Sequence, residues 1–249
     1  MNDQFKFQAQ AIPAGTTMDM SVDAGLRSFM LGVYNKMGLG LVVSGVLAYI
    51  TSSVGPVRDL LFVMNEGRVG YTGLGMVVAF SPMVILLLSM FAMRNPSKTG
   101  ANLLYWTVVT LIGAGLGVLA LVYTGQSLAS TFFVTASAFG ALSLWGYTTK
   151  RDLTGFGSFL IMGMFGLILA GIVNIFLQSP MMHFVISGLG VLIFSGLIAF
   201  DTQRLKFEYY YLKGNDTAMS VATSLGALSL YLNFINLFQF LLSFLGDRE

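Results

Sequence analysis

The sequence predicts an all-α polytopic membrane protein with seven transmembrane helices, and two observations carry that prediction. First, 55% of the 249 residues are hydrophobic and 10% are charged, with a mean hydropathy of +0.78, whereas soluble domains carry about 25% charged residues. Second, the uncharged stretches have the length that a membrane-spanning helix needs, about 20 apolar residues. The chain has no cysteine, which excludes disulfides, thiolate metal sites and cysteine nucleophiles.

Each helix is predicted from an uncharged stretch, taken in order along the chain. The first uncharged stretch is Met37–Ser53. The segment before it, Leu26–Tyr34, is apolar enough to extend the helix upstream. Thr99–Thr149 and Leu153–Phe200 are each long enough for two crossings, and polar residues interrupt them at 124–127 and 178–180. A last uncharged stretch lies near the C-terminus. The seven expected helices are 37–53, 73–93, 101–123, 127–147, 155–177, 183–200 and 222–244.

Lysine and arginine placement predicts the orientation. Residues 1–25 are polar and lack the apolar core of a signal peptide, so we expect a cytoplasmic N-terminal arm before a single membrane domain at 26–249. Ten cationic residues fall on the side of the N-terminus and three on the other, which places the N-terminus in the cytoplasm and the C-terminus outside. The ten are Lys6, Arg27, Lys36, Arg94, Lys98, Lys150, Arg151, Arg204, Lys206 and Lys213, and the three are Arg58, Arg68 and Arg248.

Asp201 directly follows a long apolar stretch, Met182–Phe200. An ionisable group within a span costs several kcal/mol and is a functional candidate. Two interpretations are open. By hydropathy alone Asp201 closes the sixth helix and pairs with Arg204 at the membrane interface. If the helix continues towards Tyr211, Asp201 lies two or more turns inside it.

The seventh helix carries a polar stripe in an otherwise apolar sequence. Its side chains fall within about 120° of one another on a helix that turns 100° per residue, and lipid cannot satisfy them. Hydrogen bonding to other helices and the lining of a hydrated path are both open interpretations. The stripe consists of Ser229, Asn233, Asn236, Gln239 and Ser243.

Nothing in the sequence indicates an enzyme. It contains no metalloprotease HExxH motif, no phosphate-binding loop and no serine–histidine–aspartate set. His183 is the single histidine, which makes a poor metal site and favours an interfacial position. The net charge of +2 shows no bias towards nucleic acid. We therefore expect no catalytic residues, no bound cofactor and no nucleic-acid partner.

Four segments of the C-terminal half, at 144–153, 174–176, 200–203 and 227–238, carry a resemblance to a known family. They resemble the transmembrane Bax inhibitor motif family, also called the Bax inhibitor-1 family, and most of all its bacterial members. The N-terminal half is similar in helix number and in Met93-Arg94, which closes the second helix.

The resemblance implies six helices around a central seventh, in a multi-pass protein of the bacterial inner membrane. It also implies a pH-sensitive calcium leak, in which two aspartates on the sixth and seventh helices share a proton. An arginine near the end of the second helix latches to the first of these aspartates. The matching positions here are Asp201, Asn233 and Arg94, so an asparagine replaces the second carboxylate.

This replacement changes what the resemblance implies. A single carboxylate has no like-charged neighbour, so we expect less pH dependence than the family has. Asp201 and the Asn233 carbonyl could still coordinate Ca²⁺, but a site with one carboxylate is weak. The expected residues of the ion path or pH sensor are Asp201, Asn233, Arg94, Asn236 and Ser229, with Asp201 as a weak calcium ligand.

Two main functions are left open by the sequence, with an intramembrane enzyme as a third and weaker option. The first is a leak path for calcium or another cation, with Asp201 as its central polar group. The alternative is a non-transporting regulator that binds other membrane proteins, such as a membrane-bound quality-control protease. The arm at 1–25 is a candidate surface for such a partner.

Overall fold

The computed structural model describes residues 23–65, 68–92 and 95–247, and this part of the chain is built almost entirely of helices. Seven helices are long and apolar enough to cross a membrane, which confirms the predicted fold class. The third of these spans is α4 together with the short helix α5. The spans are α1 (Ala24–Ser53), α3 (Gly73–Ala92), α4 (Lys98–Leu116) with α5 (Leu119–Val122), α6 (Gly125–Thr148), α7 (Thr154–Leu177), α8 (Pro180–Leu212) and α9 (Asp216–Leu245).

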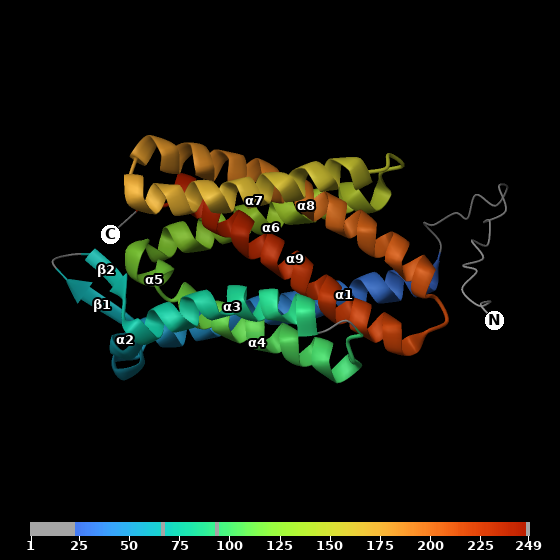
Figure 1. Ribbon diagram of the computed structural model, residues 1–249, viewed down its shortest axis with the longest axis horizontal. Helices are drawn as coiled ribbons and strands as arrows, with labels where there is room; N and C mark the ends of the chain where they lie inside the picture. The colour runs from blue at the N-terminus through green and yellow to red at the C-terminus, as the bar shows by residue number, and fades with distance from the viewer. Residues whose placement is uncertain (1–22, 66–67, 93–94, 248–249) are drawn as a thin grey trace, which may run out of the picture.

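The connection between α1 and α3 contains structure that the sequence did not predict. A short helix, α2 (Gly55–Leu61), begins with a proline in its first turn, where the missing N–H costs nothing. An antiparallel hairpin follows, in which β1 (Phe62–Asn65) pairs with β2 (Arg68–Tyr71) and Phe62 lies opposite Tyr71. Figure 1 shows this unit projecting from one end of the bundle.

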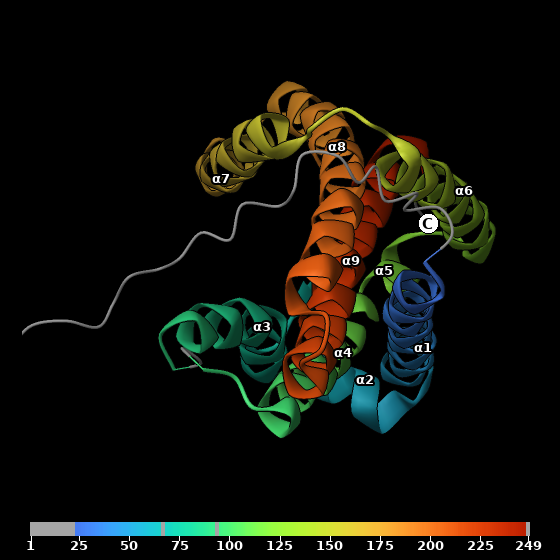
Figure 2. The same cartoon turned by 90° about the vertical axis from the view of Figure 1, so that its right-hand side faces the viewer.

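The central helix is α9, as the family resemblance implied. It packs mainly against α1, α4, α6 and α8, and Figure 2 shows it between them. The other two long helices lie farther out, with α3 packed on α4 and α7 packed on α8. The α9 span is also the most buried of the seven. Polar side chains on α9 therefore face protein on most sides.

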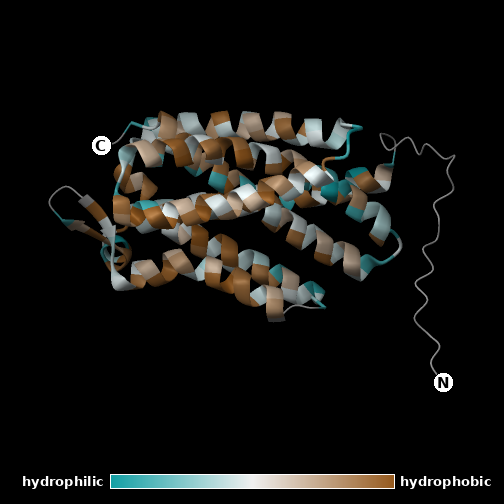
Figure 3. Ribbon diagram, turned by 45° about the horizontal axis from the view of Figure 1, so that its top comes forward, coloured by the Kyte–Doolittle hydropathy of each residue, from teal (hydrophilic) through white to brown (hydrophobic). Residues whose placement is uncertain are grey.

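The outer surface of the bundle is apolar. Figure 3 shows hydrophobic residues along the outer helices and hydrophilic residues at several connections between them. Large side chains such as Phe80 and Leu88 on α3, and Phe159 and Phe176 on α7, are exposed. Exposed apolar area on this scale indicates a lipid-facing surface.

The two ends of the chain's described part lie at opposite ends of the bundle. Figure 1 shows the start of α1 at one end and the end of α9 at the other. This arrangement agrees with an odd number of crossings. Of the predicted N-terminal arm, residues 1–22 lie outside the described residues, and α1 starts at Ala24, close to the expected upstream extension.

Asp23 ties the start of α1 to the connection between α8 and α9. Its carboxylate accepts hydrogen bonds from the Gly25 and Leu26 N–H groups at 2.9 and 3.1 Å, which caps the helix. It also pairs with Lys213 Nζ at 3.0 Å. The hydrogen bond from Lys213 lowers the pKa of Asp23, and the same bond raises the pKa of Lys213.

A lowered carboxyl pKa means that the pair stabilises the fold above the ordinary aspartate value of about 4, and that this contribution is lost as the pH falls through the folded-state pKa. We expect Asp23→Asn, which keeps a capping side chain, to lower the melting temperature in detergent micelles at pH 7 but to have little effect at about pH 2. Asp59→Asn, at a largely exposed pair with Arg58, is the control. An equal decrease at both pH values would contradict this assignment.

Candidate functional site

Asp201 lies inside a helix rather than at its end. The sequence-based boundary at residue 200 is wrong, because α8 continues about three turns further, to Leu212. Leu205 and Tyr209 follow Asp201 at intervals of four residues and are buried with it, so one face of the helix stays in the core despite the charges around it. The deeper of the two open interpretations is the observed one.

The buried Asp201 carboxylate joins α8 to α9. Its Oδ2 atom accepts hydrogen bonds from Ser229 Oγ at 2.6 Å and from Asn233 Nδ2 at 2.7 Å. Its Oδ1 atom lies 3.0 Å from a guanidinium nitrogen of Arg204, one turn along α8. Arg204 also donates to Ser229 Oγ at 3.3 Å, which closes a ring of three side chains, Asp201, Arg204 and Ser229, with Asn233 attached to it through Asp201. We call Asp201, Arg204, Ser229 and Asn233 the aspartate cluster.

The aspartate cluster is asymmetric in its exposure. The Asp201 side chain is 6% exposed and the Arg204 side chain is 45% exposed. A carboxylate in such a site must be neutralised and hydrogen-bonded, because an uncompensated buried charge is costly. Here the neutralising cation reaches the surface, so it is the member of the cluster that another cation can displace.

Two predicted site residues, Asn233 and Ser229, donate hydrogen bonds to Asp201, and their role in an ion path or pH sensor stays a prediction. Arg94 lies outside the described residues, and its predicted latch to Asp201 stays a prediction. Asn236 takes a different position: its Nδ2 atom donates to the Leu232 carbonyl of its own helix at 2.8 Å. The polar stripe therefore divides, and only part of it faces the carboxylate.

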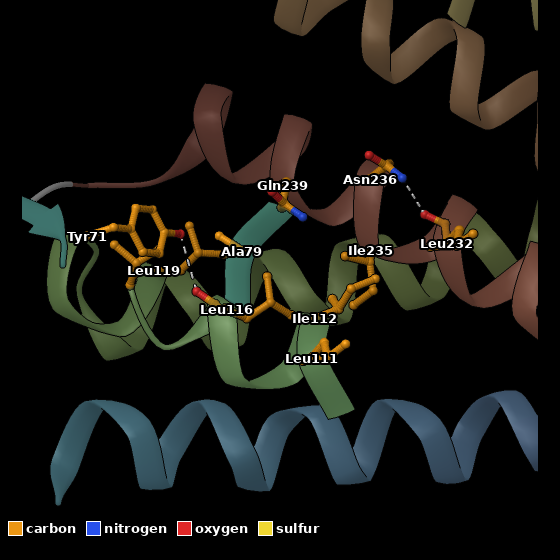
Figure 4. Close-up of a pocket in the computed structure, with 12 residues that line it drawn as sticks. Tyr71, Ala79, Leu111, Ile112, Leu116, Leu119, Leu232, Ile235, Asn236 and Gln239 are labelled. Atoms are coloured by element: carbon orange, nitrogen blue, oxygen red, sulfur yellow. Dashed lines mark hydrogen bonds between the residues drawn. The ribbon is translucent and has the colours of Figure 1, made fainter. Parts of the chain in front are cut away.

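Asn236 and Gln239 line a separate pocket of about 180 Å³ between α3, α4 and α9. Figure 4 shows both amides with Tyr71 and with apolar side chains of α4 around them. Tyr71 from β2 donates to the Gly115 carbonyl at 3.4 Å. Water fits a pocket of this size that carries polar groups.

The far end of the stripe is occupied by a hydroxyl–imidazole contact. Ser243 Oγ lies 2.8 Å from His183 Nε2 and 3.1 Å from Ser187 Oγ, both on α8. His183 thus takes part in contact between the helices near the start of α8. Hydrogen bonding between helices, one of the two interpretations of the stripe, is therefore observed at Ser229, Asn233 and Ser243, and the lining of a hydrated path stays a prediction.

Sequence reasoning missed the two residues after Asp201. Thr202 and Gln203 are buried. Thr202 Oγ1 lies 3.0 Å from Ser143 Oγ of α6. Gln203 donates to the Arg151 carbonyl at 2.7 Å and accepts from the Leu153 N–H at 2.8 Å, which fixes the connection between α6 and α7. Three consecutive polar residues in an apolar helix were the available signal.

Both oxygens of the Asp201 carboxylate already have partners in the cluster. In the described part of the chain, no three His, Cys, Asp or Glu residues gather to form a metal site. A calcium ion at Asp201 would have to replace Arg204 or the α9 donors.

The chain is similar to a known protein family and to several bacterial proteins. A family model described as "Inhibitor of apoptosis-promoting Bax1" matches residues 26–249. An uncharacterized protein of Caulobacter vibrioides is 67% identical over the full length of both chains. The inner membrane protein YbhL of Escherichia coli K12 is 41% identical over 91% of this chain and 94% of its own. An uncharacterized membrane protein of Streptococcus pyogenes is 33% identical over 91% and 96%.

The aspartate cluster makes a testable energetic prediction. Removing either charge leaves the other partner unsatisfied, so the effects of Asp201→Asn and Arg204→Met on unfolding should not add. We expect a coupling energy of about 0.5–3 kcal/mol in a double-mutant cycle, measured by denaturant unfolding in micelles. A cycle of Asp201→Asn with Lys150→Met, at an exposed lysine in the α6–α7 connection, is the control and should show no coupling. Additive effects in the first cycle would show that the pair does not contribute.

Proposed function

This chain belongs to the Bax inhibitor family, and from that premise we propose that it forms a cation leak path in the bacterial inner membrane, closed by the aspartate cluster. The name of the YbhL relative supports the inner membrane as its location. The charge distribution supports a cytoplasmic N-terminus and an outer C-terminus. The cluster then lies towards the cytoplasmic end of α8.

The observation that carries the proposal is the arrangement of polar groups along α9. Asn233 is held against Asp201, and Asn236, about 4.5 Å further along the axis, lines the 180 Å³ pocket. Most of the pocket's lining is apolar, but its two amides place hydrogen-bonding groups next to a buried, neutralised carboxylate, as we expect of a closed path between two aqueous regions. Polar groups at this depth occur where they face protein or a water-filled cavity.

Opening then means separating α8 from α9 at the cluster. Once Asp201 leaves Arg204, its two oxygens can serve a hard cation such as Ca²⁺, which prefers carboxylate and amide oxygens. The exposed position of Arg204 favours displacement by competing cations. Because Asn233 carries no proton to share, this mechanism depends on cation competition more than on pH.

Ion flux tests the path directly. In liposomes that contain only this protein, Asp201→Ala should reduce Ca²⁺ flux at least about tenfold, since removing the carboxylate removes the cation's principal ligand. Arg204→Met should increase flux, because the closed carboxylate loses its counter-ion. Asp59→Ala, at an exposed carboxylate far from the cluster, is the control and should match wild type.

The alternative function makes the opposite prediction. A regulator that transports nothing, and acts by binding another membrane protein such as a quality-control protease, gives no flux above that of empty liposomes. Absence of flux in wild type and in Arg204→Met would contradict the leak path and favour this alternative.

Position 233 tests the pH dependence. Asn233→Asp would place a second carboxylate against Asp201, and two buried like charges favour a shared proton that is lost as the pH rises. We expect this variant to acquire a flux that changes between about pH 5 and pH 8, with wild type nearly flat. Asn236→Asp is the matched control, because its side chain lies one turn away at the pocket. Equal pH responses in wild type and Asn233→Asp would contradict the interpretation.

A further inference from the structure

A second pocket, of about 370 Å³, opens between the first half of α1 and the N-terminal ends of α4 and α9. It shares no residue with the aspartate cluster or with the pocket at Asn236. Its lining is polar and contains two cations and no carboxylate. The residues are Lys36, Lys98, Thr99, Asn102, Ser220 and Ser224. We call this the lysine pocket.

Lys36 is half-buried in the lysine pocket and is held by neutral groups. Its Nζ atom donates to Asn102 Oδ1 at 2.6 Å and to Ser224 Oγ at 2.7 Å, and it lies 5.0 Å from the centre of the Tyr105 ring. These contacts orient the ammonium group but leave its charge in place. Partial burial of a positive charge without a counter-charge is unfavourable, so the site favours an anion.

Neither lysine of the pocket has a carboxylate partner among the described residues. The ion pairs found there are Arg58–Asp59, Arg204–Asp201 and Lys213–Asp23, all outside the pocket. Lys98 is exposed at the first position of α4, where the helix dipole adds positive potential. Lys36 and Lys98 therefore present two uncompensated charges to one space.

Several neutral groups around the two lysines can donate hydrogen bonds to a ligand. Because the Asn102 carbonyl oxygen accepts from Lys36, its amide nitrogen is left to donate. Thr99 and Ser220 contribute hydroxyl groups. Two ammonium groups with an amide and hydroxyls suit an anion that has several acceptor oxygens in a compact arrangement, which describes a phosphate group.

We propose that the lysine pocket binds a phosphate group, carried by the headgroup of an anionic phospholipid or present as free phosphate. The surroundings favour the lipid. Leu39, one turn beyond Lys36 on α1, is 58% exposed, and Leu103, beside Asn102 on α4, is 66% exposed. These side chains offer an apolar surface for an acyl chain next to the polar pocket. Basic pockets between membrane helices on the cytoplasmic side bind lipid headgroups in this way.

Binding of phosphatidylglycerol to the full-length protein in detergent, measured by native mass spectrometry against phosphatidylcholine of the same acyl chains, tests the proposal. Lys98→Gln should weaken phosphatidylglycerol binding about fivefold, the effect expected for one lysine near a membrane surface, and Lys36→Met should weaken it at least as much. Lys98 is exposed, so its replacement leaves the fold intact even if Lys36→Met does not. Lys150→Gln, an equal charge change outside the pocket, should bind as wild type does.

Competition with inorganic phosphate separates the two carriers. If excess phosphate displaces phosphatidylglycerol from wild type, a free phosphate group is sufficient to fill the site. If it does not, and Lys98→Gln still weakens lipid binding, the acyl chain contributes and the ligand is the lipid. Phosphatidylglycerol binding that is equal in wild type, Lys98→Gln and Lys150→Gln would overturn the proposal, whatever the outcome of the flux experiments.

Discussion

The burial of one carboxylate, Asp201, is the constraint on which much of this structure depends. An ionised group can remain in a helical core only if its charge is balanced and its oxygens are hydrogen-bonded. Arg204 supplies the charge from the next turn of α8, and Ser229 and Asn233 supply donors from α9. This requirement explains why α9, the most buried helix, carries polar side chains at 229 and 233. It also ties α8 to α9 at the level of Asp201, through the hydrogen bonds from Ser229 and Asn233.

Close backbone approach also holds α8 against α6, on a different face from its contact with α9. A β-carbon at Gly146 of α6 would overlap the backbone of Ala199 on α8, and one at Gly113 of α4 would overlap Ser44 on α1. In lipid, where there is no water to expel, such approaches are a main source of helix association. The first brings Ser143 within reach of Thr202, next to Asp201. The position of α8 is thus fixed by α6 through small residues and by α9 through the Asp201 carboxylate.

The sequence was sufficient to predict the seven membrane-spanning helices, because each crossing needs an apolar stretch of definite length, but it did not indicate the short helix α2. It was insufficient for the end of α8. Beyond residue 200, the buried Leu205 and Tyr209 alternate with charged residues, so the mean hydropathy falls although the helix continues. The pairing of Asp201 with Arg204 could be foreseen, because the two residues are three positions apart on one helix. The contact of Asn233 with Asp201 was expected only through the family resemblance. The lysine pocket combines residues from three helices distant in the chain, such as Lys36 and Ser224. No local pattern contains that information.

A reversible cross-link between α8 and α9 tests most directly whether ions pass only when this contact opens. A side chain at Gly226 of α9 would meet the buried Leu205 of α8, about one turn from the aspartate cluster. The chain has no native cysteine, so Leu205→Cys with Gly226→Cys introduces the only thiol pair. The leak path predicts that Ca²⁺ flux in liposomes stops when the disulfide forms and returns on reduction, with each single variant unaffected by oxidant. Flux that is the same before and after the cross-link forms would contradict the claim that the aspartate cluster is the gate.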